Sequence, residues 1–346
     1  MTTLFETQSN TCNVNQETSI LSGFLPQMRH ILKQYTIFNI AFLSLGIFEI
    51  LCCLIFFNLM THSHLIAITI AIFLMTLFSY FTLKIYFQHK KPQSLLRLCH
   101  SSLKKLQKKT EHMSNSTEGA LFVASSLTRL ASALKDCEYS FYQPPKGLES
   151  LRLSFEKMGC WLHWKDLHLV KEWLYLQTVE IYINLIKEKP DHLQFHMALA
   201  NTYVMFSGIY SLPKNEEIAE VARWIPSEKQ SEKIKAKFTQ CAKRAIEEFK
   251  ILNDYNPEDP WVYTQLAYSY HDLQMPQEEI KAYEKILELS PDDYDSYYKL
   301  GTLYFQQGQI AKGLKIYEQL KYNHSHKAAN LIKHYGSFTE LFSLID

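Results

Sequence analysis

The sequence predicts an all-α protein in which two membrane-spanning helices precede a solenoid of stacked helix pairs, with one insertion and a C-terminal capping helix. Three observations predict this class. Two long apolar runs lie between residues 37 and 87. Glycine is scarce, at 10 of 346 residues in a chain that is 47% hydrophobic, which disfavours a turn-rich β fold. Finally, a pattern of aromatic and small residues recurs, so that Tyr297 stands 34 residues after Tyr263.

The composition excludes some classes of function. The chain has 36 Lys and Arg against 35 Asp and Glu, so its overall charge does not favour nucleic acid or another polyanion as a partner. The seven cysteines are odd in number and form no CxxC pair, and Cys52 and Cys53 fall within an apolar run. This usage argues against a disulfide framework, and we expect the soluble part to face a reducing compartment.

The chain divides into four predicted parts. A polar leader covers residues 1–36 and is rich in Ser, Thr, Asn and Gln over 2–22. A transmembrane hairpin covers 37–87, connecting helices cover 88–158 and helical repeats cover 159–346. A cleaved signal peptide has a shorter apolar core that begins nearer the N-terminus. We therefore interpret both apolar runs as retained spans.

The hairpin consists of the runs 37–60 and 65–87, each longer than the ~20 apolar residues that cross a bilayer as a helix. The short connection between them contains no Lys or Arg, whereas basic residues flank both outer ends. Because positive charge stays on the cytoplasmic side, this distribution predicts an integral membrane protein with both termini in the cytoplasm.

Glu49 falls near the midpoint of the first run, where an unpaired carboxylate is costly. One interpretation is a protonated acid that forms a hydrogen bond across the hairpin or to another copy of the chain. The other is an ion or proton pathway, which requires a second ionisable group at similar depth. The second run offers only the hydroxyls of Thr69, Thr76 and Ser79 there, which favours the hydrogen-bonded interpretation.

A basic amphipathic helix is predicted directly after the second span. Its cations are Lys90, Lys91, Arg97, Lys104, Lys105, Lys108 and Lys109. Such a helix either lies on anionic lipid headgroups or is a solvated linker that reinforces the topology, and the sequence leaves both open. It lacks the interleaved aromatic residues of a nucleic-acid platform. Two further helices are expected over 119–141 and 148–159, separated by Pro144 and Pro145.

Two consecutive repeat units cover residues 260–293 and 294–327. The first carries Tyr263, Leu266, Ala267, Tyr270, Tyr283 and Pro291, and the second carries Tyr297, Leu300, Gly301, Tyr304 and Tyr317. This pattern resembles the tetratricopeptide repeat (TPR) family, and the likeness implies helix pairs that stack into a TPR-like α-solenoid. The sequence departs from the family pattern at Glu279, where the family keeps a small residue, and at Ser325, which replaces the closing proline.

An insertion is predicted over 209–226, because the upstream helices fall in a different 34-residue frame. We expect a short helix from Glu216 to Trp224 within it. The sequence from Ser227 to Gln230 then fits a capping box that opens a long helix. Residues 328–346 are expected to form a closing helix or helix pair that covers the last repeat.

The resemblance also implies a binding groove lined by the first helix of each pair, which receives a protein or peptide partner. The matching positions are Asn201, Trp261, Thr264, Tyr268, His271, Asp272, Asp295, Tyr298, Thr302 and Phe305. Met197 and Thr264 stand where chaperone-binding members of the family place lysines, so the sequence does not support the binding of chaperone tails.

Catalytic motifs are absent from the sequence, which contains no GxxxxGK[ST], GxSxG or HExxH pattern. We expect no enzymatic activity and no cofactor. Two histidine groups offer metal ligands, one with His192 and His196 and one around Cys160, His163, Asp166 and His168. Neither has a second ligand pair at the spacing of structural zinc, so packing or surface roles are favoured.

These observations favour a membrane-anchored scaffold that assembles a complex or recruits a partner. A second hypothesis comes from the leader and the hairpin, which resemble the bilobed hydrophobic hairpin of secreted inclusion-membrane proteins of intracellular bacteria. That likeness implies an array that faces host cytosol and recruits a host protein. A third hypothesis, from a different class, is an ion or proton pathway centred on Glu49.

Overall fold

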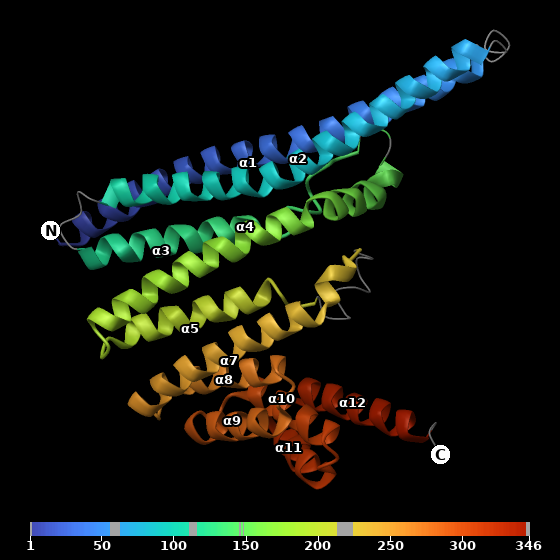
Figure 1. The fold of residues 1–346 in the computed structure, drawn as a ribbon. Helices are drawn as coiled ribbons and strands as arrows, with labels where there is room; N and C mark the ends of the chain where they lie inside the picture. Colours follow the sequence, from blue (N-terminus) through green and yellow to red (C-terminus); the bar gives the residue numbers. More distant parts are fainter. Residues whose placement is uncertain are drawn as a thin grey trace. The chain divides into compact units, whose positions relative to one another are not determined.

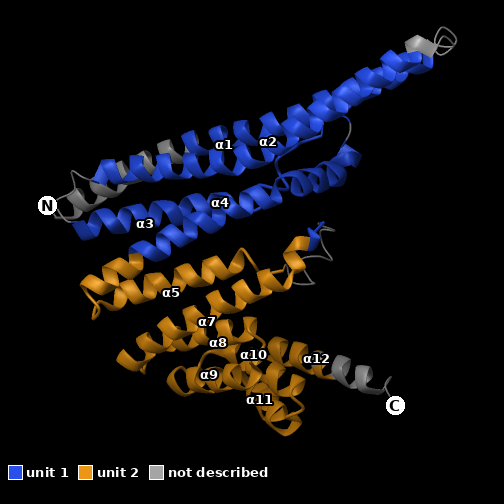
Figure 2. Cartoon of the chain, in the orientation of Figure 1, with its two compact units in different colours: residues 1–181, 213–227 blue, residues 182–212, 228–346 orange. Residues whose placement is uncertain are grey.

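The structure is a computed structural model that describes residues 2–55, 63–110, 116–144, 147, 149–212 and 224–343 (Figure 1). Within these residues every regular element is a helix, which confirms the all-α prediction. The chain forms two compact units, one of residues 1–181 and 213–227 and the other of residues 182–212 and 228–346 (Figure 2).

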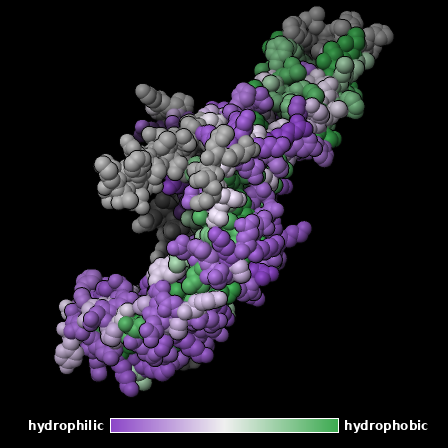
Figure 3. Space-filling view, turned by 90° about the vertical axis from the view of Figure 1, so that its left-hand side faces the viewer, coloured by the Kyte–Doolittle hydropathy of each residue, from purple (hydrophilic) through white to green (hydrophobic). Residues whose placement is uncertain are grey.

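The hairpin belongs to the first unit. Helices α1 (Thr2–Ile55) and α2 (Ser63–Thr110) run side by side, and both are long and apolar enough to cross a membrane. Among the described residues, none of either apolar stretch is buried by the rest of the structure, and hydrophobic side chains gather over this part of the hairpin in Figure 3. Residues 56–62, which include the end of the first predicted run and half of the predicted connection over 61–64, lie outside the described residues.

Part of the predicted polar leader packs in the core of this unit. Phe24, Met28 and Leu32 are 2%, 1% and 0% exposed. Their spacing of four residues places them on one face of α1, one helical turn apart. The leader's last turns are therefore a structural extension of the first span, a role that the prediction of a polar leader did not include.

The connecting helices differ from the prediction at both inner ends. Helix α3 (Ser116–Ala133) ends eight residues before the expected 141, in turns that include Asp136 at a φ of 58°. After the short helix η1 (Glu149–Leu151), α4 (Arg152–Glu188) runs through the expected stop at Gly159. A Cβ at Gly159 would lie 2.7 Å from the Glu138 carbonyl oxygen, so this glycine allows a close backbone contact instead of ending a helix.

The second unit is a succession of packed helices. They are α5 (Leu193–Gly208), α7 (Glu232–Tyr255), α8 (Pro260–Asp272), α9 (Pro276–Leu289), α10 (Tyr294–Gln306), α11 (Ile310–Asn323) and α12 (Ser325–Ser343). From α7 onward each helix packs on the next along the chain, α5 packs on α7, and α12 contacts both α10 and α11. The predicted closing segment is thus one helix that covers the last pair.

The predicted insertion lies largely outside the described residues, because residues 213–223 are not described. The helix expected from Glu216 falls there. The capping-box prediction is wrong, since Ser227–Gln230 forms the short helix η2 and α7 begins at Glu232 behind Ser231. The side chain of Ser231 makes no capping hydrogen bond.

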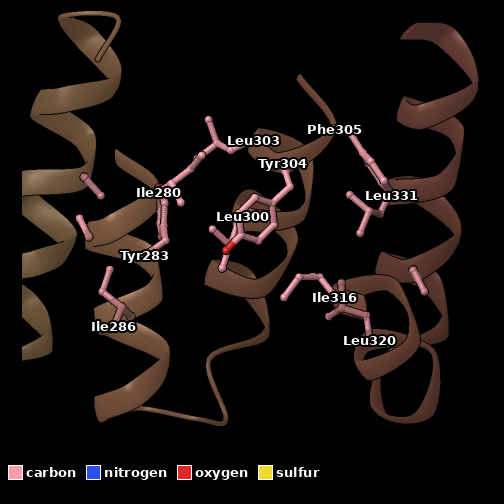
Figure 4. Packing of buried hydrophobic residues seen from close by; sticks show 13 residues of the cluster. Ile280, Tyr283, Ile286, Leu300, Leu303, Tyr304, Phe305, Ile316, Leu320 and Leu331 are labelled. Atoms are coloured by element: carbon pink, nitrogen blue, oxygen red, sulfur yellow. The ribbon is translucent and has the colours of Figure 1, made fainter. Parts of the chain in front are cut away.

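The core of the clear repeats explains their small residues (Figure 4). A Cβ at Gly301 would lie 2.7 Å from Leu331 Cδ2 on α12 and 3.1 Å from Ile316 Cγ2 on α11, so only glycine allows this approach without displacement. Helix α10 begins where predicted, because the Asp293 carboxylate accepts hydrogen bonds from the backbone N–H groups of Asp295 and Ser296.

Candidate protein-binding surface

Side-chain contacts join the first helices of successive pairs. Lys299 Nζ on α10 donates to Tyr268 Oη on α8 at 3.0 Å. Lys327 Nζ on α12 donates to Asp295 Oδ1 on α10 at 2.8 Å, and this hydrogen bond lowers the pKa of Asp295. We use the term first-helix surface for one set of exposed and half-buried side chains of α5, α8 and α10. Its members are Met197, Asn201, Val204, Met205, Trp261, Thr264, Tyr268, His271, Asp272, Asp295, Tyr298, Lys299 and Thr302.

Helix α8 presents two aromatic side chains on this surface. Trp261 is 37% exposed and Tyr268 is 45% exposed. The start of α8 is fixed by the Asp259 carboxylate, which accepts from the backbone N–H of Trp261, and by Pro260 at the first helical position. Trp261 packs edge-on against Phe249 of α7 with ring centroids 6.1 Å apart. One side of its indole is therefore supported while the other remains in solvent.

Lys299 is a member of this surface that the sequence analysis missed. Its ammonium lies 4.4 Å from the centroid of the Tyr268 ring, a cation–π distance, in addition to its hydrogen bond with the same side chain. It stands 31 residues after Tyr268, one turn before the equivalent position in the next repeat. The 34-residue repeat could have identified it, because residues on adjacent first helices contact each other at a sequence separation of one repeat less one helical turn.

His271 has a partner inside its own repeat. Its Nδ1 lies 3.1 Å from Oε1 of Glu279, whose residue is 5% exposed at the start of α9. Burial raises the pKa of Glu279, and the neighbouring His271 partly opposes this shift. The pair explains how this chain accepts a carboxylate at a position where TPR proteins keep a small residue. It also ties His271 to the structure of the repeat.

Phe305 does not belong to the surface, and its prediction as a groove residue is wrong. Its side chain is 6% exposed and lies among the core residues beside Leu331 (Figure 4). The ring packs against Tyr335 at 5.0 Å between centroids, and a Cβ at Gly313 would overlap it. The aromatic ring therefore fills the space left by a glycine on α11.

The remaining predicted positions lie where the helical spacing places them. Asn201, Asp272 and Asp295 are exposed, whereas Thr264, Tyr298 and Thr302 are half-buried. The hydroxyl of Thr264 donates to the Pro260 carbonyl oxygen and that of Thr302 donates to the Tyr298 carbonyl oxygen. A partner would therefore meet the methyl groups of both threonines more readily than their hydroxyls.

Helix α5 adds an apolar strip that the sequence analysis did not assign. Met197, Val204 and Met205 are 36%, 37% and 47% exposed, and Asn201 lies between them on the same face. The buried face of α5 is apolar too, with Phe195 and Leu199 3% and 2% exposed among its residues. Because the helix is apolar on both faces, its sequence period does not distinguish the outward side.

The basic stretch of α2 requires one correction. Lys91 is buried at 9% exposure and its Nζ lies 2.5 Å from Asp166 Oδ2 of α4, so it does not belong to a membrane surface. The other six cations, Lys90, Arg97, Lys104, Lys105, Lys108 and Lys109, are exposed. Leu95 and Leu106 on the opposite face are 1% and 0% exposed. The apolar face is therefore covered by protein, as expected of a linker helix.

Glu49 forms the hydrogen bond across the hairpin that the favoured interpretation required. Thr76 Oγ1 on α2 donates to Glu49 Oε1 on α1 at 2.6 Å. Nearer the base of the hairpin, Tyr80 donates to Asn39 Oδ1 at 3.3 Å. These two hydrogen bonds join α1 and α2 at two depths. They help to fix how the helices are aligned along their length, which apolar packing alone does only weakly.

The two histidine groups considered as metal sites are engaged in other contacts. His196 lies 2.7 Å from Glu248 Oε2 through Nδ1 and 3.0 Å from the Pro190 carbonyl oxygen through Nε2. His163 Nε2 lies 2.9 Å from Tyr142 Oη. Among the described residues, no group of three or more His, Cys, Asp and Glu side chains is arranged to hold a metal ion.

Two tetratricopeptide repeat family models match the chain, one at residues 262–293 and one at residues 282–315. The first coincides with the pair α8 and α9, and the second covers most of α9, all of α10 and the start of α11. Residues 262–315 therefore carry tetratricopeptide repeats, as the sequence pattern predicted. TPR units are protein-interaction modules, so this match supports a scaffold over an enzyme.

Solved structures give a weaker likeness. A MamA RS-1 double mutant matches at 12% identity with a TM-score of 0.31, covering 67% of this chain and 93% of that one. MamA from Desulfovibrio magneticus RS-1 matches at 10% identity with a TM-score of 0.31, covering 64% and 92%. TM-scores this low do not establish a common arrangement, and the repeat assignment rests on the matched residues. No curated protein matches the chain in sequence.

Proposed function

We propose that this chain is a non-enzymatic, membrane-anchored scaffold that binds a protein or peptide on its first-helix surface, in the assembly of a complex or the recruitment of a partner. The observation that carries the proposal is the pair of exposed aromatic residues, Trp261 and Tyr268, on the first helix of a matched repeat. Large aromatic side chains that remain half in solvent dominate the energetics of protein interfaces.

The anchor in this proposal is the hairpin of α1 and α2. In the described part of the two apolar runs, most of its apolar side chains remain exposed, including Ile55 at 73% and Met75 at 73%. An apolar surface of this extent is unfavourable in water and favourable in a bilayer. Lysines and arginines flank only the outer ends of the spans, which supports cytoplasmic termini.

The chemistry of the surface favours a partner with apolar side chains and a limited number of charges. The strip of α5 supplies Met197, Val204 and Met205, and methionine adapts to irregular apolar ligands. Next to the aromatic residues of α8, Lys299 supplies a cation and Asp272 an exposed carboxylate. This mixture suits an amphipathic helix or an extended peptide better than a purely acidic tail.

The test compares two exposed tyrosines of the second unit. Tyr268→Ala removes an aromatic residue of the first-helix surface, whereas Tyr322→Ala removes one that is 90% exposed at the end of α11. Affinity capture from native membranes with full-length protein should lose one specific partner in the first variant, by about 30-fold if Tyr268 is a hot spot worth 2 kcal/mol. Equal capture by both variants would exclude this surface.

A further inference from the structure

The part of α2 beyond the spans carries exposed cations that the scaffold function does not use. Residues 88–110 contain no Asp or Glu, so the helix offers these cations no partner of its own. Among the described residues, Lys91 is the one cation of this stretch with an ion-pair partner. The exposed cations, which we call the basic row, are Lys90, Arg97, Lys104, Lys105, Lys108 and Lys109.

Helical geometry places the basic row on one side of α2. At about 100° per residue, all of its members except Lys109 fall within an arc of roughly 100°. The buried residues Leu95 and Cys99, at 1% and 0% exposure, lie on the other side. From Lys90 to Lys108 the row is about 27 Å long. Three of its members follow one another at intervals of seven residues, or about 10 Å, and these are Lys90, Arg97 and Lys104.

Contacts across the hairpin fix the level at which both apolar runs end. Tyr35 and Phe38, on either side of the start of the first run, pack against Phe87 at the end of the second, with ring centroids 6.4 and 4.8 Å apart. Beyond Phe87, α2 continues as one helix to Thr110 (Figure 1). At 1.5 Å per residue, Lys90 stands about 5 Å along the helix from Phe87, whereas Lys104 stands about 25 Å from it.

This distance separates most of the basic row from the bilayer of the proposed anchor. The potential of anionic headgroups decays over a Debye length, which is about 8 Å at physiological salt. To bring Lys104 within that distance, α2 would have to lean by roughly 70° from the bilayer normal. Spanning helices lean by about 0–40°. Lipid headgroups therefore reach Lys90 but not the outer part of the row.

The surroundings of the basic row disfavour a nucleic acid. Residues 88–110 contain no Phe, Tyr or Trp, so this stretch offers no stacking platform for a single strand. A duplex would have to admit α2 into its major groove, which is about 12 Å wide. Helices α1 and α3 both pack on α2. Because each helix is itself about 10–12 Å across, the packed group is too wide to enter that groove.

We propose that the basic row binds an acidic helix of a protein partner, with carboxylates at intervals of seven residues. The proposal rests on the membrane anchor of the proposed function but does not involve the first-helix surface. A helix packed alongside α2 presents every seventh residue to the same side, so its carboxylates meet Lys90, Arg97 and Lys104 in turn. Between these cations the row has the polar side chains of Ser94 and Ser101. Binding is therefore electrostatic and weakens with salt.

Two designed peptides test the proposal with the full-length protein in phosphatidylcholine nanodiscs. Both are alanine-based helices of about 24 residues with the same composition. One has glutamate pairs every seven residues, and the other has its glutamates spread evenly around the helix. The protein should bind the first peptide at least about fivefold more tightly at about 20 mM salt, and this preference should disappear at about 0.5 M salt. Equal binding of the two peptides at low salt would overturn the proposal.

Variants of the protein assign the binding to the basic row. Arg97→Gln, Lys104→Gln and Lys108→Gln together should reduce the preference to less than about twofold. A second triple variant with Glu at the same positions should prefer a peptide with lysines in place of glutamates, a gain that a misfolded chain cannot produce. The matched control replaces three exposed lysines of unit 2 by Gln and should keep the wild-type preference. These lysines are Lys243, Lys250 and Lys281.

Cross-linking in native membranes identifies the class of the partner. A photoreactive amino acid replaces Ser101, which is exposed within the row. It should yield a protein adduct whose cross-linked segment carries acidic residues at seven-residue spacing, and the triple Gln variant should lose this adduct. Labelling of lipid or nucleic acid instead would overturn the proposal. Failure of the first-helix surface is a separate result, because Tyr268→Ala should leave both the adduct and the peptide preference unchanged.

Discussion

Replacement of Gly313 by alanine has two opposing effects, a gain in helix propensity and a loss of good packing in the repeat core. An alanine in a helix interior is favoured over glycine by about 1 kcal/mol. At this position, however, the new Cβ would meet Phe305 Cε1, and would lie 2.6 Å from Cδ1 and 2.9 Å from Cζ of the same ring. Phe305 is 6% exposed and packs against Tyr335, so its ring has no open space to enter.

The expected net effect is a loss of stability. Overpacking of a core costs about 1–3 kcal/mol, so the net destabilisation after the propensity gain lies between about 0 and 2 kcal/mol. Because the Phe305 ring has no open space to enter, we expect the upper half of that range, about 1–2 kcal/mol. Gly208→Ala is the matched control, since no described atom lies within 4 Å of its added Cβ beyond its own helix. That variant should be as stable as the wild type or more stable by up to about 1 kcal/mol.

Amide hydrogen exchange measures this effect locally, which suits a chain with two compact units. The amides of α10 and α11 should exchange about 5–30 times faster in Gly313→Ala, the factor that corresponds to one or two kcal/mol. Exchange in Gly208→Ala should be unchanged or slower. If Gly313→Ala left α10 and α11 as protected as in the wild type, the placement of Phe305 over Gly313 would be refuted.

Three further predictions concern the first unit. Lys91→Met leaves Asp166 buried without its cation and should destabilise unit 1 by about 3–5 kcal/mol in hydrogen exchange, while the exposed neighbour Lys90→Met should change little. Burial lowers the pKa of His163 from 6.5 to about 3, so the unfolded chain binds a proton that the folded chain does not. This contribution of neutral His163 to the free energy of unfolding is complete above pH 6.5 and is lost as the pH falls toward 3. His163→Gln should therefore reduce the fall in melting temperature between pH 6.5 and pH 3. Glu49→Gln retains an acceptor for Thr76, so partner capture and cellular behaviour should both equal those of the wild type, whereas a loss of cellular behaviour with intact partner capture would favour a proton pathway.

Local signals in the sequence predicted the repeats well. The end of α9 before Pro291 and the start of α10 behind Asp293 each follow from chemistry within one or two turns. A proline or a capping carboxylate acts on its own helix, so its effect can be predicted without knowledge of the tertiary structure. The hydrogen bond from Thr76 to Glu49 was predictable for a similar reason, because a hairpin offers few polar partners at one depth.

The errors arose where a distant segment decides the role of a residue. Gly159 has the form of a helix end, yet its missing side chain accommodates the Glu138 carbonyl group. In the sequence Lys91 is one of several similar cations, but in the structure it is buried in an ion pair with Asp166 of another helix. Phe305 has the helical spacing of the first-helix surface. Its ring nevertheless packs in the core, in the space that the missing side chain of Gly313 leaves on α11. A single sequence does not show which of these residues contact one another in the folded protein.

Site-specific photo-crosslinking in native membranes tests the central claim most directly. A photoreactive amino acid is placed at Val204, Trp261 and Tyr268 on the first-helix surface, and at Tyr255 and Tyr322, which are 60% and 90% exposed at the ends of α7 and α11. A membrane-anchored scaffold should yield one common protein adduct from the first three positions, in the carbonate-resistant membrane fraction, and none of that adduct from the last two. Adducts of equal yield from all five positions, or a full-length protein released by carbonate, would contradict it.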